Sequence, residues 1–257
     1  APRPCGETPA GLVGRSDGPG DLRRDGQLRR AFVQAADGNV ALLGRLADTE
    51  SPVEVTLAVG FGSNPQAALR EARTSLERSP SEVLDAYVRE WQAYVRPLQR
   101  VPAPYDRQFQ MAAMMLKAHE DKKRPGAMIA SLTIPWGHET DASEGNVGGY
   151  HLVWSRDLYQ VALAFDAIGD RDAALRALDY IFTVQQRPDG SVPQNSWLDG
   201  RPYWTSLQLD EVAYPILLAE QLGRTDARTW ERHVKRAADF PVAKGPATPQ
   251  ERWEEES

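Results

Sequence analysis

Apolar residues recur at helical spacing over most of the chain beyond residue 65, and this periodicity constrains the fold more than any other feature of the sequence. A spacing of three and four residues puts side chains on one face of a helix, so each segment has an apolar stripe to bury. Asn64 followed by Pro65 is a typical helix start, with the polar side chain as the cap. The predicted helices are residues 65–78, 80–96, 105–120, 156–168, 171–186, 206–222 and 226–240.

The connections between the later helices alternate in length. Residues 169–170 and 223–225 are short turns that contain glycine, whereas residues 125–153, 187–205 and 241–253 are long loops rich in Trp, Gly and Pro. Long loops inside a compact domain are usually functional. Short turns at one end and long loops at the other are expected for helical hairpins around an axis, with the site at the loop end. We therefore predict an α/α toroid; a plain helical-repeat scaffold is the alternative, but it does not require such Trp-rich loops.

A different pattern precedes the helices. Residues 1–26 are rich in Gly, Pro and charge without any period, which predicts loop or disorder. Residues 27–35 and 39–46 flank Ala36-Asp37-Gly38, which is typical of a hairpin turn, and the alternating residues 53–61 predict a third strand. Three strands cannot bury a core by themselves. We interpret them as the last strands of a β-domain.

The composition excludes several classes of protein. Of the 257 residues, 41% are hydrophobic, which is enough for a sizeable core. The net charge of −6 gives no basic excess for binding nucleic acid, and no run approaches the roughly 20 apolar residues of a membrane span. The single cysteine, Cys5, cannot form an internal disulfide. No pattern indicates a metal or another cofactor; a structural calcium ion is compatible with the chain, but the sequence does not support one.

An Arg-Asp pair, Arg156-Asp157, stands where a long loop enters a helix, at the end of the stretch GGYHLVWSRD. The guanidinium offers forked donors and the carboxylate offers acceptors, so together they can bracket adjacent hydroxyl groups of one sugar. Spacing alone favours a simpler alternative, a helix N-terminal Asp stabilised by the helix dipole beside a surface Arg. Trp154 precedes the pair, and flat aromatic rings suit the apolar faces of sugars.

The following loop, residues 189–200, combines amides, acids and Trp197, and Tyr203-Trp204 come directly after it. Such a set can form a rim that binds sugar hydroxyls. Packing in a core is the default for each aromatic residue, and contact with a ligand is the alternative. Asp210-Glu211 lie in the next helix, where either residue has the alternative of being an exposed helical acid.

A third motif, TPQERWEEE, occupies residues 248–256. Thr248 can cap a helix and Glu251 completes a capping box, so Glu251 has a structural explanation. Glu254 and Glu255 then stand beside a Trp. Adjacent carboxylates and an aromatic wall both raise the pKa of a carboxyl group, as a general acid working near neutral pH requires. The alternative is a solvated run of glutamates.

Together these motifs resemble glycoside hydrolase family 15, in its bacterial glucoamylase and glucodextranase branch. The resemblance runs from about residue 30 onward, and residues 33–62 are similar to the end of that branch's N-terminal β-sandwich. Any one motif is weak, but six in family order are specific. The six are residues 116–122, 134–137, 148–157, 189–199, 207–213 and 248–255.

The resemblance implies a mainly α chain, in which part of an (α/α)6 toroid follows the last strands of a β-sandwich domain and a helical linker. The implied boundaries are 1–62 for the β-sandwich remnant, 63–103 for the linker and 104–257 for the N-terminal half of the catalytic domain. The implied activity is exo-acting hydrolysis of α-glucan oligosaccharides or polysaccharides of the starch or dextran type, which releases glucose from non-reducing ends with inversion.

The resemblance also assigns roles to individual residues. Arg156 and Asp157 match the pair that holds the terminal glucose, with Trp154 beside them. Glu254 matches the general acid, and Glu255 is expected to contact the following sugar. The aromatic residues expected to line the pocket are Trp136, Trp197 and Trp204.

Two departures from the family pattern limit this expectation. Ser155 stands where the bacterial branch usually has Pro, which predicts a looser Arg-Asp geometry. Inversion also needs a second carboxylate about 6.5–9.5 Å from the first, and in the family this base comes from a later helix than this sequence contains. We therefore expect a fragment, truncated at both ends, that lacks the general base, is inactive alone, and has the missing C-terminal half of the catalytic domain as a partner.

Other interpretations remain open at this point. The chain could be a non-catalytic glucan-binding fragment, or belong to a trehalase-like or phosphorylase enzyme built on the same toroid. The sequence starts at Ala1 without a charged-then-apolar leader, so any signal peptide is expected to be removed or to lie upstream. The resemblance favours a secreted bacterial enzyme over a cytoplasmic one, without deciding the compartment.

Overall fold

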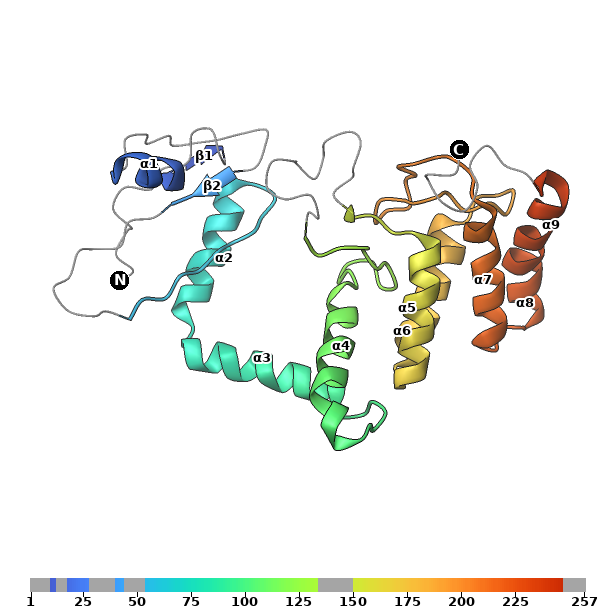
Figure 1. Ribbon diagram of the computed structural model, residues 1–257, viewed down its shortest axis with the longest axis horizontal. Coiled ribbons are helices and arrows are strands. Elements are labelled where there is room, and N and C mark those ends of the chain that lie inside the picture. Colours follow the sequence, from blue (N-terminus) through green and yellow to red (C-terminus); the bar gives the residue numbers. More distant parts are fainter. Residues whose placement is uncertain (1–9, 13–17, 28–39, 44–53, 134–149, 247–257) are drawn as a thin grey trace. The chain divides into compact units, whose positions relative to one another are not determined.

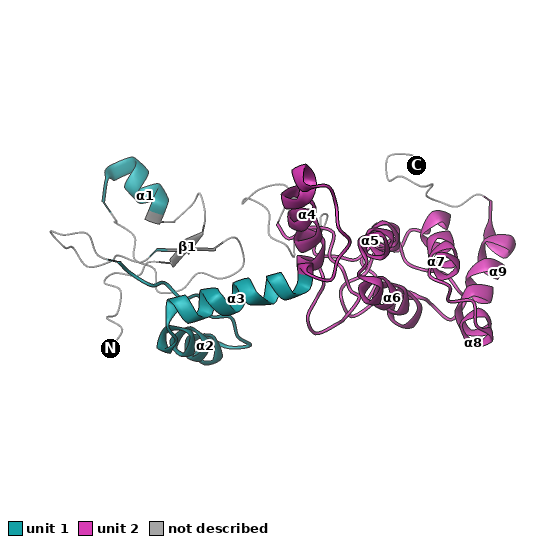
Figure 2. Cartoon of the chain, turned by 90° about the horizontal axis from the view of Figure 1, so that it is seen from below, with its two compact units in different colours: residues 1–94 teal, residues 95–257 magenta. Residues whose placement is uncertain are grey.

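The structure is a computed structural model of the chain, and it describes residues 10–12, 18–27, 40–43, 54–133 and 150–246. The chain forms two compact units, residues 1–94 and residues 95–257 (Figure 2). The three-part division at residues 62 and 103 therefore stays a prediction. In the described ranges, no helix combines the length and the apolar character that crossing a membrane requires.

The first unit contains a small antiparallel pairing near its N-terminal end. Strand β1 (Ala10–Leu12) pairs with β2 (Val40–Leu42), with Ala10 opposite Leu42, and helix α1 (Gly18–Asp25) lies between them in the chain (Figure 1). The prediction of loop or disorder for residues 1–26 is therefore wrong at β1 and α1. Local composition did not reveal them, because β1 is short and depends on a partner far along the chain.

The remaining strand predictions had different outcomes. Strand β2 lies inside the predicted segment 39–46 and confirms part of it. The predicted segment 27–35, apart from its first residue, and the turn Ala36-Asp37-Gly38 lie outside the described residues.

The predicted strand over residues 53–61 is wrong where the structure describes it, since residues 54–61 are not part of a sheet. Its apolar side chains at alternate positions are more than half exposed; they are Val55, Leu57, Val59 and Phe61. The end of the segment lies against the following helix instead. At Gly60 the two backbones are so close that an added Cβ atom would lie 2.0 Å from the carbonyl oxygen of Ala68. Alternation gives a strand two faces, but a strand also needs a neighbour to bond with, and sequence alone did not show whether one is present.

The first two predicted helices are confirmed as α2 (Pro65–Glu77) and α3 (Pro80–Val95). Asn64 caps α2 as expected, because its Oδ1 accepts a hydrogen bond of 2.9 Å from the Ala67 N–H. Pro65 occupies the first turn, where its missing N–H costs nothing and its fixed φ suits a helix.

The second unit is built of helices in hairpins, and Figure 1 shows them side by side. After a single 3₁₀ turn, η1 (Ala103–Tyr105), come α4 (Asp106–Ala118), α5 (Ser155–Ile168), α6 (Arg171–Tyr180), α7 (Leu209–Gln221), α8 (Ala227–Thr229) and α9 (Lys235–Lys244). Two π-helical stretches, η3 (Ile181–Gln185) and η4 (Trp230–Val234), interrupt the predicted segments 171–186 and 226–240. The positions of the helices are therefore confirmed, while their internal geometry is not uniform.

The short turn between α5 and α6 closes as its sequence predicts. Gly169 ends α5 in the left-handed conformation with φ +94°, and the Asp170 side chain accepts a hydrogen bond of 3.1 Å from the Ala173 N–H at the start of α6. A glycine C-cap followed at once by an aspartate N-cap reverses the chain within two residues. The hairpin arms then face each other over a common core.

The core of this unit lies between α5, α6 and α7. Phe165 of α5, Leu178 of α6 and Leu218 of α7 are inaccessible to solvent, and alanines such as Ala162 of α5 and Ala174 of α6 are fully buried in the same cluster. Because these residues recur at three- and four-residue intervals, each helix contributes one stripe, as the periodicity predicts. This packing holds the loop ends of the three helices together.

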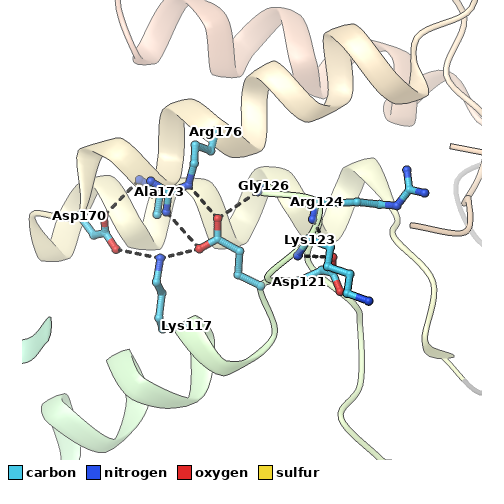
Figure 3. A network of polar contacts seen from close by, with 9 residues as sticks. Lys117, Asp121, Lys123, Arg124, Gly126, Asp170, Ala173 and Arg176 are labelled. Carbon is cyan, nitrogen blue, oxygen red and sulfur yellow. Dashed lines mark hydrogen bonds and ion pairs between the residues drawn. The ribbon is translucent and has the colours of Figure 1, made fainter. Parts of the chain in front are cut away.

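The partly buried carboxylate of Glu120, just after α4, links the end of this helix to α6 through the side chains of Lys117 and Arg176, which Figure 3 shows on the two helices. Its Oε1 and Oε2 accept hydrogen bonds from the Arg176 guanidinium at 2.8 and 3.0 Å, and Lys117 Nζ lies 2.5 Å from Oε2. The Gly126 N–H donates a further bond of 3.0 Å to Oε1. Two cations and one amide therefore converge on a single carboxylate that is only 9% exposed.

A loop glycine, Gly190, sits against the backbone of α9. It has φ +90°, and a Cβ atom there would lie 2.1 Å from the Arg236 carbonyl oxygen. We expect Gly190→Ala to lower the free energy of unfolding by about 2–3 kcal/mol, because it combines backbone strain with a collision that only backbone movement can relieve. Chemical denaturation of the chain measures this.

The matched control for that substitution is Gly223→Ala. Gly223 also has a positive φ, +66°, but the nearest atom to an added Cβ is 3.9 Å away, on the flexible Arg171 side chain. Only the strain of about 1 kcal/mol applies there. Equal losses for the two variants would contradict the close approach of Gly190 to α9.

Candidate active site

Two long loops meet where α5 begins, and their backbones are joined there. Val153 and Ser196 exchange N–H···O bonds of 2.8 and 3.0 Å, and Ser196 also bridges to Pro202. The buried Gln185 side chain donates to the Val153 carbonyl oxygen at 2.9 Å and to Ser196 Oγ at 3.0 Å. The residues that follow Val153 and Ser196 are therefore held at one end of the helical layer, which is the loop end expected from sequence.

Aromatic side chains from both loops form a continuous row at this end. Ring centroids are 5.2 Å apart for Tyr150 and Trp154, 5.8 Å for Trp154 and Trp204, 5.7 Å for Trp204 and Tyr203, and 5.4 Å for Tyr203 and Trp197. Tilted and edge-on arrangements of this kind are favourable contacts between rings. The structure thus brings three of the tryptophans expected at the site into one aromatic row, which we define as these five residues.

Asn195 of the second loop fixes the backbone of two members of this row. Asn195 is fully buried, and its Oδ1 accepts a hydrogen bond of 2.9 Å from the Trp204 N–H while its carbonyl oxygen accepts one of 3.2 Å from Tyr203. Trp154, by contrast, is buried itself, so its ring is part of the wall rather than a free face. The other four members of the row are half-buried, so each keeps part of its surface exposed; among them are the tryptophans Trp197 and Trp204.

Arg156 points toward the first turn of α7. Its Nε donates to Asp210 Oδ2 at 2.8 Å, and its Nη2 donates to Gln208 Oε1 at 2.5 Å and to Asp210 Oδ1 at 3.2 Å. Glu211 Oε1 completes the surroundings at 3.5 Å from Nη2. The Arg156 side chain is 15% exposed, so the alternative of a surface Arg is wrong.

The electrostatics of Arg156 follow from these partners. Burial by itself lowers the pKa of the guanidinium, but its hydrogen bond to Asp210 and the charges of Glu211, Asp210 and Asp157 outweigh it and raise the pKa. The guanidinium is therefore a permanent cation in a fixed orientation. Asp157 itself is exposed in the first turn of α5, where the helix dipole favours its negative charge.

Glu211 is fully buried, at 0% exposure, so the alternative of an exposed helical acid is wrong for this residue. Its Oε2 accepts a hydrogen bond of 2.7 Å from the Arg156 N–H. Ser155 Oγ lies within hydrogen-bonding distance of Glu211 Oε2 and, at 2.8 Å, of the Glu211 carbonyl oxygen. Burial raises the pKa of Glu211 to about 8, against the opposing effect of the Arg156 charge.

From sequence, Asp210 and Glu211 belong to the motif 207–213 but receive no individual role, although a signal for Glu211 was present. Glu211 precedes Pro215 by four residues and Leu218 by seven, and all three are buried residues of α7. A carboxylate at that spacing continues the apolar stripe and must find partners inside the protein. Gln208, in the same motif, is also fully buried just before α7, and no role was expected for it from sequence.

Ser155 has a role that a proline could not have. It is the first residue of α5 and fully buried, and its hydroxyl reaches α7 through Glu211. The departure from the family pattern at this position therefore adds a contact between α5 and α7. Whether the Arg-Asp geometry is looser than in relatives stays a prediction.

Three of the expected site residues, Trp136, Glu254 and Glu255, lie outside the described residues, so their roles stay predictions. Within the described ranges, no group of three or more His, Cys, Asp or Glu side chains is placed to hold a metal ion.

Both units are similar to known protein families. A family model of glycosyl hydrolases family 15 matches residues 104–257, and a model of glucodextranase, domain N, matches residues 1–96. A curated glucoamylase of Clostridium sp. is 41% identical over 235 residues, which are 91% of this chain and 32% of that protein. An uncharacterized glycosyl hydrolase of Methanocaldococcus jannaschii is 33% identical over 63 residues, 24% of this chain and 10% of that protein.

A solved structure extends the comparison to the fold. The crystal structure of a bacterial glucoamylase complexed with acarbose matches with a TM-score of 0.77 and 36% identity, over 97% of this chain and 36% of that chain. The chain thus spans about a third of the length of these glucoamylases. The fold expected from sequence, mainly helical with part of an (α/α)6 toroid, is confirmed.

The family resemblance drawn from six motifs is confirmed as well, since the family model covers more than half of the chain and contains all six motifs in order. The buried Arg156 and the aromatic row both lie inside that matched region. This chain belongs to the glycosyl hydrolases family 15.

Proposed function

We propose that the complete protein containing this chain is an inverting, exo-acting α-glucoside hydrolase, which releases glucose from the non-reducing ends of α-glucans of the starch or dextran type. The observation that carries the proposal is the fixed guanidinium of Arg156 at the loop end of the helices, at the start of α5 directly after Trp154 of the aromatic row. A sugar needs both elements, donors for its hydroxyls and flat apolar surfaces for its C–H faces.

The geometry around Arg156 suits a substrate-holding role. The guanidinium donates two hydrogen bonds to Asp210 and one to Gln208, which hold it in one orientation before any ligand arrives. Donors that are already oriented lose little entropy on binding, so more of the interaction energy appears as affinity. Asp157 is exposed next to this cation and is the acceptor that we assign to a neighbouring hydroxyl of the same glucose.

The chemical step requires a proton donor and a base. We assign the donor to Glu254, which follows Trp253, and the contact with the next sugar to Glu255. Inversion also needs a carboxylate that activates water on the opposite face of the sugar. We assign this base to a segment of the complete protein outside the present 257 residues, so this chain alone is not expected to turn over substrate.

The known relatives support an α-glucan as substrate. The curated relative from Clostridium sp. is a glucoamylase, and the solved relative was crystallised with acarbose. Secretion from a bacterial cell is part of the proposal, because glucan polymers are too large to cross a membrane unaided. Fractionation of cells that produce the complete protein tests this.

A direct test uses the complete protein with maltooligosaccharides and isomaltooligosaccharides, and follows the anomer of the first product by NMR. We expect glucose to be released as the β-anomer. Binding of oligosaccharides without turnover would instead identify a glucan-binding protein. Sugar release that depends on phosphate would identify a phosphorylase, and cleavage of trehalose in preference to oligosaccharides would identify a trehalase-like enzyme.

The half-buried Trp204 provides a quantitative test of the aromatic row. We expect Trp204→Ala to raise KM for a maltooligosaccharide about fivefold, because a lost ring contact costs about 1 kcal/mol. Steady-state kinetics on the complete protein measure this. The matched control is Trp230→Ala, since Trp230 is 48% exposed on η4 and does not belong to the row. An equal rise in KM for both variants would remove Trp204 from the binding surface.

A further inference from the structure

The contacts of Ser155 with Glu211 bear on whether the Glu211 carboxyl group is protonated. Ser155 Oγ has two neighbours on Glu211, the main-chain carbonyl oxygen at 2.8 Å and the side-chain Oε2. A carbonyl oxygen only accepts, and an ionised carboxylate oxygen only accepts, whereas a hydroxyl group has a single proton to give. With an ionised Glu211, the single Ser155 proton would have to be shared between two acceptors in a three-centre bond, and the close contact with Oε2 would lack a full hydrogen bond.

A proton on Glu211 removes this conflict. Ser155 then donates its proton to the Glu211 carbonyl oxygen, and the Glu211 carboxyl donates its own proton from Oε2 to Ser155 Oγ. Oε2 can still accept the 2.7 Å hydrogen bond from the Arg156 N–H, because a carboxylic acid hydroxyl both donates and accepts. Every atom of this triangle then has a partner of the right kind.

The other carboxyl oxygen supports the same assignment. Oε1 of Glu211 is buried without a hydrogen-bond donor, and Arg156 Nη2 lies 3.5 Å away. A fully charged oxygen in that position would carry a large desolvation penalty, while the carbonyl oxygen of a neutral acid carries a much smaller one. Arg156 meanwhile already has an ionic partner in Asp210 at 2.8 Å.

We propose that Glu211 is a neutral carboxylic acid in the working protein and that, through its proton and its bond to the Arg156 N–H, it is a positioning residue for the arginine that holds the substrate. The role in substrate binding rests on the function proposed above; the proton assignment does not. The charged groups that face Glu211 from the described elements are Arg156 of α5 and Asp210 of α7.

These contacts fix the position of Arg156. Glu211 lies on α7 and holds the first two residues of α5, while Asp210 and Gln208 hold the guanidinium of the same arginine. The backbone and the side chain of Arg156 are thus both held by residues at the start of α7. Burial raises the pKa of Glu211 from 4.5 to about 8, so the stability that its proton contributes is fully present below pH 4.5 and is lost as the pH rises from there through about 8.

The first arm of the test detects the proton directly. We expect the infrared spectrum of the complete protein at pH 6 to contain a protonated carboxyl band that is absent from Glu211→Gln and that disappears on titration to pH 10. Absence of a difference band between the two proteins at pH 6 would overturn the proposal.

Ser155→Ala tests the proton assignment a second time. The midpoint of the Glu211 titration should shift in one direction if Glu211 donates to Ser155, and in the other direction if Ser155 donates to an ionised Glu211. If Glu211 donates its proton to Ser155, loss of the hydroxyl removes a partner of the neutral form, and the midpoint of the titration falls. If Ser155 donates to an ionised carboxylate, loss of the hydroxyl removes a partner of the charged form, and the midpoint rises. A rise would overturn the proposal.

The functional arm compares two variants of the complete protein. Glu211→Gln keeps the size, the neutrality and, through its amide oxygen, the acceptor for the Arg156 N–H, and it loses only the donor to Ser155, so we expect kcat/KM on maltooligosaccharides to stay within about fivefold of the parent. Glu211→Ala removes the contacts, and we expect KM to rise at least tenfold more than in the Gln variant. Equal losses in the two variants would contradict a neutral positioning residue.

The two proposals fail separately. If the complete protein cleaves no α-glucoside, the proposed function is wrong, but the infrared band and its response to Ser155→Ala still judge the proton on Glu211. If activity is present and the band is missing, only the positioning role of a neutral Glu211 is wrong. Thermal unfolding of each variant confirms that it is folded before either reading is made.

Discussion

Replacing Glu254 with glutamine is expected to lower kcat of the complete protein on maltooligosaccharides by about 10²–10⁴-fold, while KM changes by less than about threefold. The glutamine side chain has the size and polarity of the glutamate but has no acidic proton to give to the departing glycosidic oxygen. The effect therefore falls on the chemical step and not on binding. Steady-state kinetics at the pH optimum of the parent protein measure it.

The matched control is Glu256→Gln, which changes the same residue type two positions along in the same glutamate run. We expect it to leave kcat within about twofold of the parent. Near-full activity of Glu254→Gln would show that the general acid is another residue. A substrate whose leaving group needs no protonation, such as glucosyl fluoride, adds a diagnostic: it should restore much of the lost rate in Glu254→Gln.

The largest stability effect in the described part of the chain is expected at Glu120. We predict that Glu120→Ala lowers the free energy of unfolding by about 3–5 kcal/mol. The substitution leaves the Arg176 guanidinium and the Lys117 ammonium facing each other without the carboxylate that they share, and it leaves the Gly126 N–H without its acceptor (Figure 3). Chemical denaturation of the chain at pH 7 measures the loss.

The matched control is an ion pair of the same kind on the surface. Lys235 Nζ and Asp239 Oδ2 lie 2.6 Å apart, but their side chains are 50% and 65% exposed. We expect Asp239→Ala to cost no more than about 0.5 kcal/mol, because exposed pairs are screened by water. Similar losses at Glu120 and Asp239 would show that the Glu120 carboxylate is not the link between α4 and α6 that its geometry indicates.

The same carboxylate makes stability depend on pH. Burial raises the pKa of Glu120, but the hydrogen bonds from Arg176, Lys117 and Gly126 outweigh it and lower the pKa from 4.5 to about 2. The resulting stabilisation, about 3 kcal/mol, is present above pH 4.5 and is lost as the pH falls toward 2. Denaturation of Glu120→Gln at pH 7 and at pH 3 should therefore show a smaller difference than the parent shows.

The helices of the second unit were predictable because their signals are local. The apolar stripes of α5, α6 and α7 repeat every three or four residues, and the turn Gly169-Asp170 contains both the cap that ends one helix and the cap that begins the next. Each of these signals acts within one or two helical turns. Reading them required no knowledge of which helix packs on which.

The first unit shows the opposite case. The alternating residues 54–61 have the pattern of a strand but are not part of a sheet, while β1 forms in a segment without a strand pattern. Pairing of β1 with β2 depends on residues about thirty positions apart in the chain, with Ala10 opposite Leu42. Strand formation is decided by such distant partners, so local alternation was not sufficient.

For the site, the sequence by itself determined the family, through six motifs in family order. It also located Arg156, one of the candidate site residues, where a long loop enters a helix. Only the tertiary structure decided the environment of that arginine. Asp210 and Glu211 stand 54 and 55 residues further along the chain, and the packing of α5 on α7 makes one an ion partner and the other a buried acid. Charge and proton affinity depend on burial and on neighbours in space, and a linear pattern records neither.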